Sequence, residues 1–155
     1  MKKILFFAFV LVVCAVTFTA CERNDVDSRD SFIGEYTFNA TGDVELYVGS
    51  TRLFNVPLDQ DGTFIISKAE EEGQVMIVGY NDTIYAAESG NNLFIESTVT
   101  NEEYNGATIK MTFIYGKATL VENRLSWETD VQATATYGVL SGSGTGHISV
   151  VATKK

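Results

Sequence analysis

Thr108-Ile-Lys-Met-Thr-Phe-Ile-Tyr115 and Val131-Gln-Ala-Thr-Ala-Thr-Tyr137 decide the fold, because apolar and polar side chains alternate along both stretches. A period of two is the pattern of a β-strand that turns one face to a core and the other to water. The inward face of the first stretch is predicted to carry Ile109, Met111, Phe113 and Tyr115. That of the second is predicted to carry Val131, Ala133, Ala135 and Tyr137.

The alternation extends outward from these two stretches through most of the chain. Toward the N-terminus, Tyr36, Phe38 and Ala40 share a face, and Val44, Leu46 and Val48 continue it beyond a turn or bulge at Gly42. Further strands are predicted at residues 52–58, 63–67, 74–80, 83–87, 93–99, 124–128 and 146–153. Asp61-Gly62 has the composition of a tight turn, and no apolar stripe of helical spacing follows the leader. The pattern predicts one all-β domain over residues 32–155, with nine or ten strands.

The sequence is compatible with two arrangements of these strands, a barrel and a sandwich. Short links between successive strands favour an antiparallel up-and-down meander, and closing such a meander into a barrel removes its exposed edges. A β-sandwich is the alternative. Small Ala133 and Ala135 beside bulky aromatic residues leave room for a cavity, or they interdigitate with their neighbours.

The first 21 residues form a separate segment. Lys2 and Lys3 precede an apolar run over residues 4–18, and Thr19-Ala20-Cys21 follows. A basic start, an apolar middle and a small residue before the cut are typical of a secretory signal. With Cys directly after Ala20, the segment resembles a bacterial lipoprotein signal. This resemblance implies removal of residues 1–20, acylation of Cys21 and attachment to the outer membrane of a cell envelope, on its periplasmic or cell-surface side. An uncleaved anchor helix and simple secretion are the alternatives.

The residues that follow Cys21, and the overall composition, limit the partners. Residues 21–31 are polar without periodicity, which predicts a flexible tether. Cys14 and Cys21 are the two cysteines, so the mature domain is predicted to have no disulfide. The formal net charge is −9 with no basic patch, which argues against nucleic acid as a partner.

The sequence gives no signature of catalysis. A Ser-His-Asp or Cys-His arrangement needs a histidine base, and His147, the one histidine, lies in a Gly/Ser-rich stretch. Zinc sites need several His or Cys ligands. Asp59-Gln60-Asp61-Gly62 lacks the remaining ligand positions of a calcium loop. We therefore expect no enzymatic activity, no metal and no cofactor.

Phe32-Ile33-Gly34-Glu35-Tyr36 resembles the Gly-x-aromatic start of lipocalin-like barrels, with Tyr36 where lipocalins carry Trp. Together with the leader, the Gly-rich residues 141–146 and the two C-terminal lysines, the chain is similar to small calycin-like lipoproteins of Bacteroidetes. The resemblance implies a barrel whose mouth binds a small apolar or amphipathic molecule. The candidates for lining its cavity are Tyr36, Phe113, Tyr115, Trp127 and Tyr137.

A different class of function is an envelope interaction module, which would contact a glycan or a protein partner through exposed aromatic residues such as Tyr47, Tyr80 or Tyr104. An apolar cavity of at least ~300 Å³ inside the barrel would favour the carrier, and a solid core with aromatic residues outside would favour the module. Asp82-Thr83-Ile84 also resembles the Asp-Thr-aliphatic site of O-glycosylation in exported Bacteroidetes proteins, which implies modification of Thr83.

Substitution of the predicted lipid site provides a direct test of the leader. Because acyl chains supply the membrane affinity, the Cys21→Ala variant is expected to leave the membrane fraction, whereas the unmodified chain remains in it. Fractionation followed by immunoblotting measures this distribution. A variant that stays with membranes would contradict the lipoprotein prediction.

Overall fold

The computed structural model describes residues 27–79 and 82–155, and these residues form an all-β domain with eleven strands and no α-helix. No helix among them is long and apolar enough to cross a membrane. The all-β prediction is confirmed, with one or two strands more than expected. The elements are the 3-10 helix η1 (Ser28–Ser31) and strands β1 (Gly34–Val48), β2 (Thr51–Pro57), β3 (Gln60–Lys68), β4 (Gln74–Val78), β5 (Thr83–Ser89), β6 (Asn92–Ile95), β7 (Thr98–Tyr104), β8 (Ala107–Phe113), β9 (Gly116–Val121), β10 (Arg124–Tyr137) and β11 (Leu140–Lys154).

Eight of the strands close into a ring. The hydrogen-bonded order is β11-β1-β3-β4-β5-β6-β9-β10, and β10 pairs again with β11. Every pairing in the ring is antiparallel. The chain therefore forms the predicted antiparallel barrel, and the sandwich alternative is wrong.

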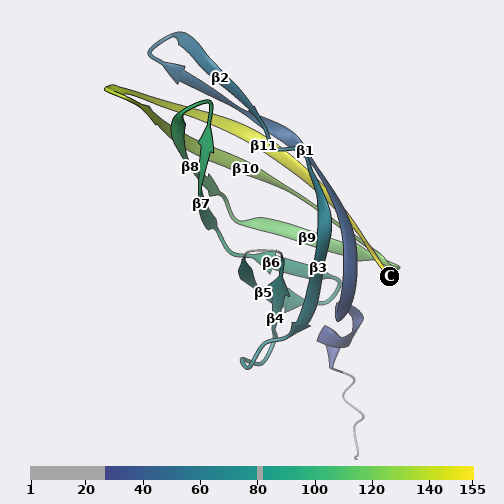
Figure 1. The fold of residues 1–155 in the computed structure, drawn as a ribbon. Helices are drawn as coiled ribbons and strands as arrows, with labels where there is room; N and C mark the ends of the chain where they lie inside the picture. Colours follow the sequence, from purple (N-terminus) through teal and green to yellow (C-terminus); the bar gives the residue numbers. More distant parts are fainter. Residues whose placement is uncertain (1–26, 80–81) are drawn as a thin grey trace, which may run out of the picture.

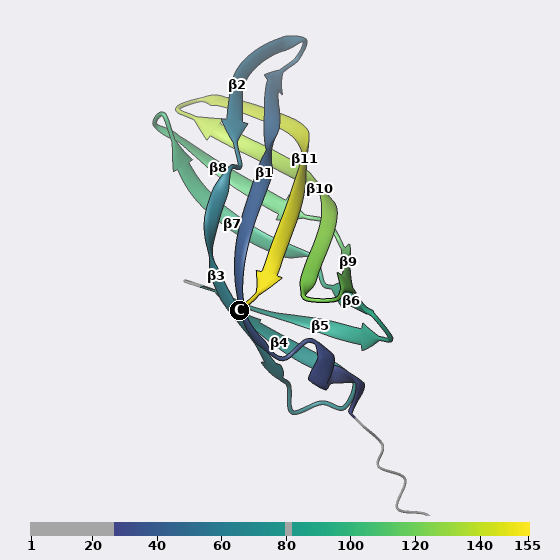
Figure 2. The same cartoon turned by 90° about the vertical axis from the view of Figure 1, so that its right-hand side faces the viewer.

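Three long strands, β1, β10 and β11, extend beyond this ring. Along β1, the strand β3 pairs with residues 34–40 and β2 with residues 43–48. Along β10, β9 pairs with residues 124–126 and β8 with residues 131–136. The molecule thus has a closed half, and a flared half in which the strand order is β2-β1-β11-β10-β8-β7. No hydrogen-bonded pairing joins β2 to β7 within the described strands. Figures 1 and 2 show the long strands running from one half into the other.

Glycines allow these long strands to bend where the two halves meet. A straight strand of 15 residues would be roughly 50 Å long. Instead, β11 bends and packs closely against β1. A Cβ atom built on Gly144 would lie 1.7 Å from the backbone oxygen of Glu45, and one on Gly146 would lie 2.0 Å from that of Asp43. At Gly42, a Cβ would lie 2.2 Å from the backbone oxygen of His147. Backbone occupies the space of a side chain at all three positions, so only glycine fits.

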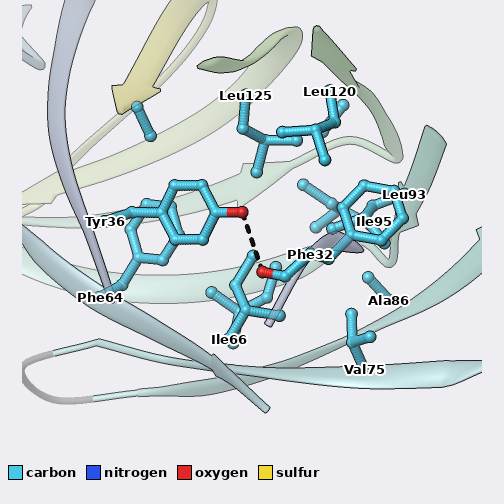
Figure 3. Packing of buried hydrophobic residues seen from close by; sticks show 13 residues of the cluster. Phe32, Tyr36, Phe64, Ile66, Val75, Ala86, Leu93, Ile95, Leu120 and Leu125 are labelled. Atoms are coloured by element: carbon cyan, nitrogen blue, oxygen red, sulfur yellow. Dashed lines mark hydrogen bonds between the residues drawn. The ribbon is translucent and has the colours of Figure 1, made fainter. Parts of the chain in front are cut away.

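The closed half has a core that reaches down to η1. Phe32, which follows η1, and Tyr36 at the start of β1 are fully buried among apolar residues of β3 to β6, β9 and β10 (Figure 3). The Tyr36 hydroxyl donates a hydrogen bond of 2.9 Å to the Phe32 carbonyl oxygen. The Tyr36 ring stacks on Phe64, with 5.3 Å between the ring centroids. Phe32 therefore closes this end of the barrel, and Tyr36 holds it there.

The flared half has its own core. Its buried residues come from the inner faces of β1, β2, β8, β10 and β11: Ala40, Val44, Leu46, Val56, Ala107, Ile109, Met111, Val131, Ala133, Ala135, Ile148 and Val150. Phe38 and Trp127 pack against both cores. The inward sets predicted for the two opening stretches are confirmed at Ile109, Met111, Val131, Ala133 and Ala135.

Four sequence expectations differ from the structure. No turn or bulge occurs at Gly42, because β1 runs through it in unbroken register with β11. Asp61-Gly62 does not form a turn but lies within β3, because β2 and β3 follow one another along the same partner strand. Tyr115 does not face inward, because the link between β8 and β9 shifts the alternation by one residue. Residues 27–31, predicted as part of a flexible tether, form η1 and the residue that caps it, whereas residues 21–26 lie outside the described part.

The bend predicts a large effect of a single methyl group. Gly144→Ala is expected to lower the free energy of unfolding by at least about 2 kcal/mol, because the new Cβ overlaps the β1 backbone. Gly79→Ala is the matched control, since the nearest heavy atom to its Cβ lies 3.9 Å away. Urea unfolding followed by Trp127 fluorescence measures both variants. Equal midpoints would show that the β1 backbone moves without cost.

Removal of the Tyr36 hydroxyl is expected to weaken the closed end. Tyr36→Phe keeps the stacked ring but leaves the Phe32 carbonyl oxygen without its donor, which costs about 1 kcal/mol of stability. The same urea titration measures this loss, and the exposed Tyr85→Phe is the control. An unchanged midpoint for Tyr36→Phe would contradict the structural role of this hydrogen bond.

Candidate functional site

The flared half ends in three hairpins that project from the same end of the molecule (Figure 1). They join β1 to β2, β7 to β8 and β10 to β11. Tight links form because Asn105 and Gly106 in the second hairpin, and Gly138 in the third, adopt positive φ angles. Strands distant in sequence thereby bring their ends together.

Aromatic rings from all three hairpins meet at this end. The Phe54 ring on β2 lies 6.3 Å from that of Tyr104 on β7, nearly perpendicular at 85°. The same Phe54 ring lies 6.5 Å from that of Tyr137, at 66°. Edge-to-face contacts of this kind stabilise aromatic pairs, and here they join two strands that share no backbone pairing. We call Phe54, Tyr104 and Tyr137 the rim aromatics.

Next to the rim aromatics, the β10–β11 hairpin exposes apolar side chains. Tyr137 is 50% exposed, Val139 100% and Leu140 47%. Residues 131–146 contain no charged side chain, although the chain as a whole has a formal net charge of −9. An uncharged hairpin with an apolar tip differs from the surface of an ordinary acidic domain.

The interior of the barrel holds the two apolar cores, and two hollows lie on its outside. One, of about 390 Å³, is lined by Lys68, Ala69, Glu70, Glu71, Gln74, Met76 and Tyr85. The other, of about 480 Å³, is lined by Tyr47, Lys110, Thr112, Gln132, Ala133, Thr134, Ser143, Gly144 and Thr145. Neither is the internal apolar cavity that a carrier was expected to have.

The predicted cavity residues do not gather in one place. Tyr36 is in the closed core, Trp127 packs against both cores, and Phe113 is partly buried in the flared one. Tyr137 is a rim aromatic. The fifth, Tyr115, is 53% exposed and stacks on Phe94 outside the barrel, with 6.0 Å between ring centroids.

The residues proposed for an interaction module also do not lie together. Tyr47 is half-buried on the outer face of β1, Tyr104 is a rim aromatic, and Tyr80 lies outside the described residues. Cys21 lies outside them as well. Thr83 begins β5 and its side chain is exposed. Sequence reasoning missed Phe54, Val139 and Leu140, although the exposed Val-Leu pair beside Gly138 was a visible signal.

The groups considered for catalysis or metal binding have structural partners. His147 is exposed on β11, with its Nδ1 atom 3.1 Å from Oδ1 of Asp130 and its Nε2 atom 3.7 Å from Oε2 of Glu128. Asp59 accepts a hydrogen bond from the Gly42 amide, and Asp61 accepts one from the Asn39 side chain. Within residues 27–79 and 82–155, no cluster of His, Cys, Asp or Glu side chains is suited to hold a metal ion.

The opposite end of the barrel is held by charged contacts. Arg29 of η1 donates hydrogen bonds to the carbonyl oxygens of Ala69, Glu71 and Gln74, and it pairs with Asp27 at 2.8 Å. The hydrogen bonds from Arg29 and then Lys68 hold the pKa of the Asp27 carboxyl far below its usual range. The charged Asp27 carboxylate can therefore pair with both Arg29 and Lys68.

Comparison with known proteins adds little beyond this geometry. No family model matches the chain, and no curated protein matches it in sequence. Among solved structures it is similar to the YwiB protein of Bacillus subtilis, with a TM-score of 0.31 and 9% identity over 78% of this chain and 93% of that one. A likeness this remote carries no argument about function. The class that the fold itself defines is an eight-stranded antiparallel β-barrel.

Proposed function

We propose that this chain is a lipid-anchored protein of the cell envelope, held in the outer membrane through Cys21, that binds a small apolar or amphipathic ligand and has no catalytic role. The basis for the anchor is the leader described above. The basis for the binding role is the flared end of the barrel.

The rim aromatics are the observation that carries the proposal. Phe54, Tyr104 and Tyr137 present ring surface at an end where β2 and β7 are joined by side chains alone. Tyrosine offers both an apolar ring and a polar hydroxyl, a combination that suits an amphipathic molecule. Val139 and Leu140 extend the apolar surface outward, and exposed apolar patches on otherwise polar proteins mark interaction sites.

The proposed site lies at an end of the barrel, as the lipocalin resemblance implied, but not in an internal cavity. Buried side chains fill both halves of the barrel, so a ligand would lie at the rim, between the hairpins. Separation of β2 from β7 would deepen this site, because no backbone hydrogen bond opposes the movement.

A second candidate is the interaction module. The stacked Phe94 and Tyr115 on the outer surface, and the two hollows outside the barrel, favour a protein that binds with its exterior. Under this candidate the partner is a glycan or another protein of the envelope.

The rim proposal predicts binding of a fluorescent fatty acid. The full chain in mild detergent is expected to raise the emission of a dansyl-labelled fatty acid. Tyr137→Ser should weaken the affinity roughly tenfold, since about 1.4 kcal/mol of buried ring contact is lost. Tyr115→Ser is the matched control, because it removes a ring of similar exposure from the outer surface.

Native mass spectrometry of the purified protein complements the titration by detecting a ligand that co-purifies. Equal affinities of the two serine variants would place any binding away from the rim. Absence of binding in the titration together with absence of a co-purified ligand would contradict the carrier role and leave the interaction module.

A further inference from the structure

We propose that the outer face of the flared half, over the 480 Å³ hollow, binds an uncharged glycan. This inference deepens the second candidate function and rests on it, whereas it is independent of the rim aromatics. The hollow crosses four neighbouring strands, β8, β10, β11 and β1.

The pairing register arranges the outward side chains of these strands in rows. One row runs from Lys110 through Thr134 and Ser143 to Tyr47. The next runs from Thr112 through Gln132 to Thr145. Adjacent strands lie about 4.8 Å apart, so hydroxyl and amide groups repeat at short intervals across the sheet, with an aromatic ring at the end of one row.

The chemistry of these rows selects for neutral polar ligands. A Ser or Thr hydroxyl both donates and accepts hydrogen bonds, and the Gln132 amide does so with separate atoms. Sugar hydroxyls need the same two roles from their partners. Of the residues that line the hollow, Lys110 alone carries a charge, and the nearby Glu45, opposite Thr145, is already paired with Arg52.

Tyr47 is held in place as a flat surface for a sugar ring. Its hydroxyl donates a hydrogen bond of 2.7 Å to Oε2 of Glu45, whose Oε1 pairs with Nη1 of Arg52 at 2.8 Å. This bond from Tyr47, more than the pair with Arg52, lowers the pKa of Glu45, and the same bond raises the pKa of Tyr47. A ring fixed before binding loses less entropy when a ligand stacks on it.

The other hollow does not share this chemistry. Lys68, Glu70 and Glu71 line it, and Lys68 already pairs with Asp27 and Asp30. Its Tyr85 therefore provides a control ring in a charged surrounding.

Affinity electrophoresis of the full chain in native gels that contain xylan, mannan or hydroxyethyl cellulose tests the proposal. At least one of these neutral polysaccharides is expected to retard the protein. Thr134→Val, which keeps strand propensity and removes one hydroxyl, should weaken binding about three- to tenfold. Tyr47→Ala should abolish the retardation. Thr37→Val, at an exposed threonine of the closed half, and Tyr85→Ala should leave it unchanged.

Three results would overturn the proposal: no retardation by any neutral polysaccharide, equal retardation of Thr134→Val and the unmodified chain, or retardation by polygalacturonate alone, which would indicate simple attraction to Lys110. Circular dichroism confirms that each variant is folded. The dansyl fatty acid titration on the same samples separates this site from the rim, because Thr134→Val should leave that affinity unchanged whatever the gels show.

Discussion

The close approach of β1 to β11 is the constraint on which the rest of the structure depends. Gly42, Gly144 and Gly146 face the interior, where any side chain would collide with the backbone of the opposite strand. Because no side chain lies between them there, β1 and β11, of 15 residues each, bend together and belong to both halves of the molecule. Strands twist without such bends, and the glycines add the extra curvature that barrel closure needs.

The same bend separates the molecule into two halves that differ in how they close. Where the strands turn, the partners of β1 and β10 each break in two, and the Thr129 hydroxyl donates to the Ile114 carbonyl oxygen at one of these breaks. One half closes fully and is sealed by Phe32. The other has two edges, β2 and β7, that no backbone pairing joins within the described strands.

Alternation of apolar residues predicted the architecture well, because a strand's inward set follows from local sequence. Ile109, Met111 and the alanines of β10 faced inward as expected. Tyr115 failed because the link between β8 and β9 shifts the alternation by one residue, and local sequence does not reveal where such a shift occurs. The contact between the rim aromatics could not be predicted from the sequence for a similar reason. Phe54, Tyr104 and Tyr137 are far apart in sequence, and their meeting depends on the curvature that the glycines permit.

The docking of η1 has a consequence for the position of the molecule relative to a bilayer. The Asp27–Lys68 ion pair and the hydrogen bonds from Arg29 to three carbonyl oxygens tie the start of the domain to its sealed end. The Lys154 ammonium reaches the Ser31 carbonyl oxygen there. Asp27 follows Cys21 by six positions, and an extended chain of six steps spans about 20 Å. If Cys21 carries the acyl chains, the sealed end of the barrel stays within about that distance of the bilayer, and the hairpins lie at the other end of the molecule (Figure 1).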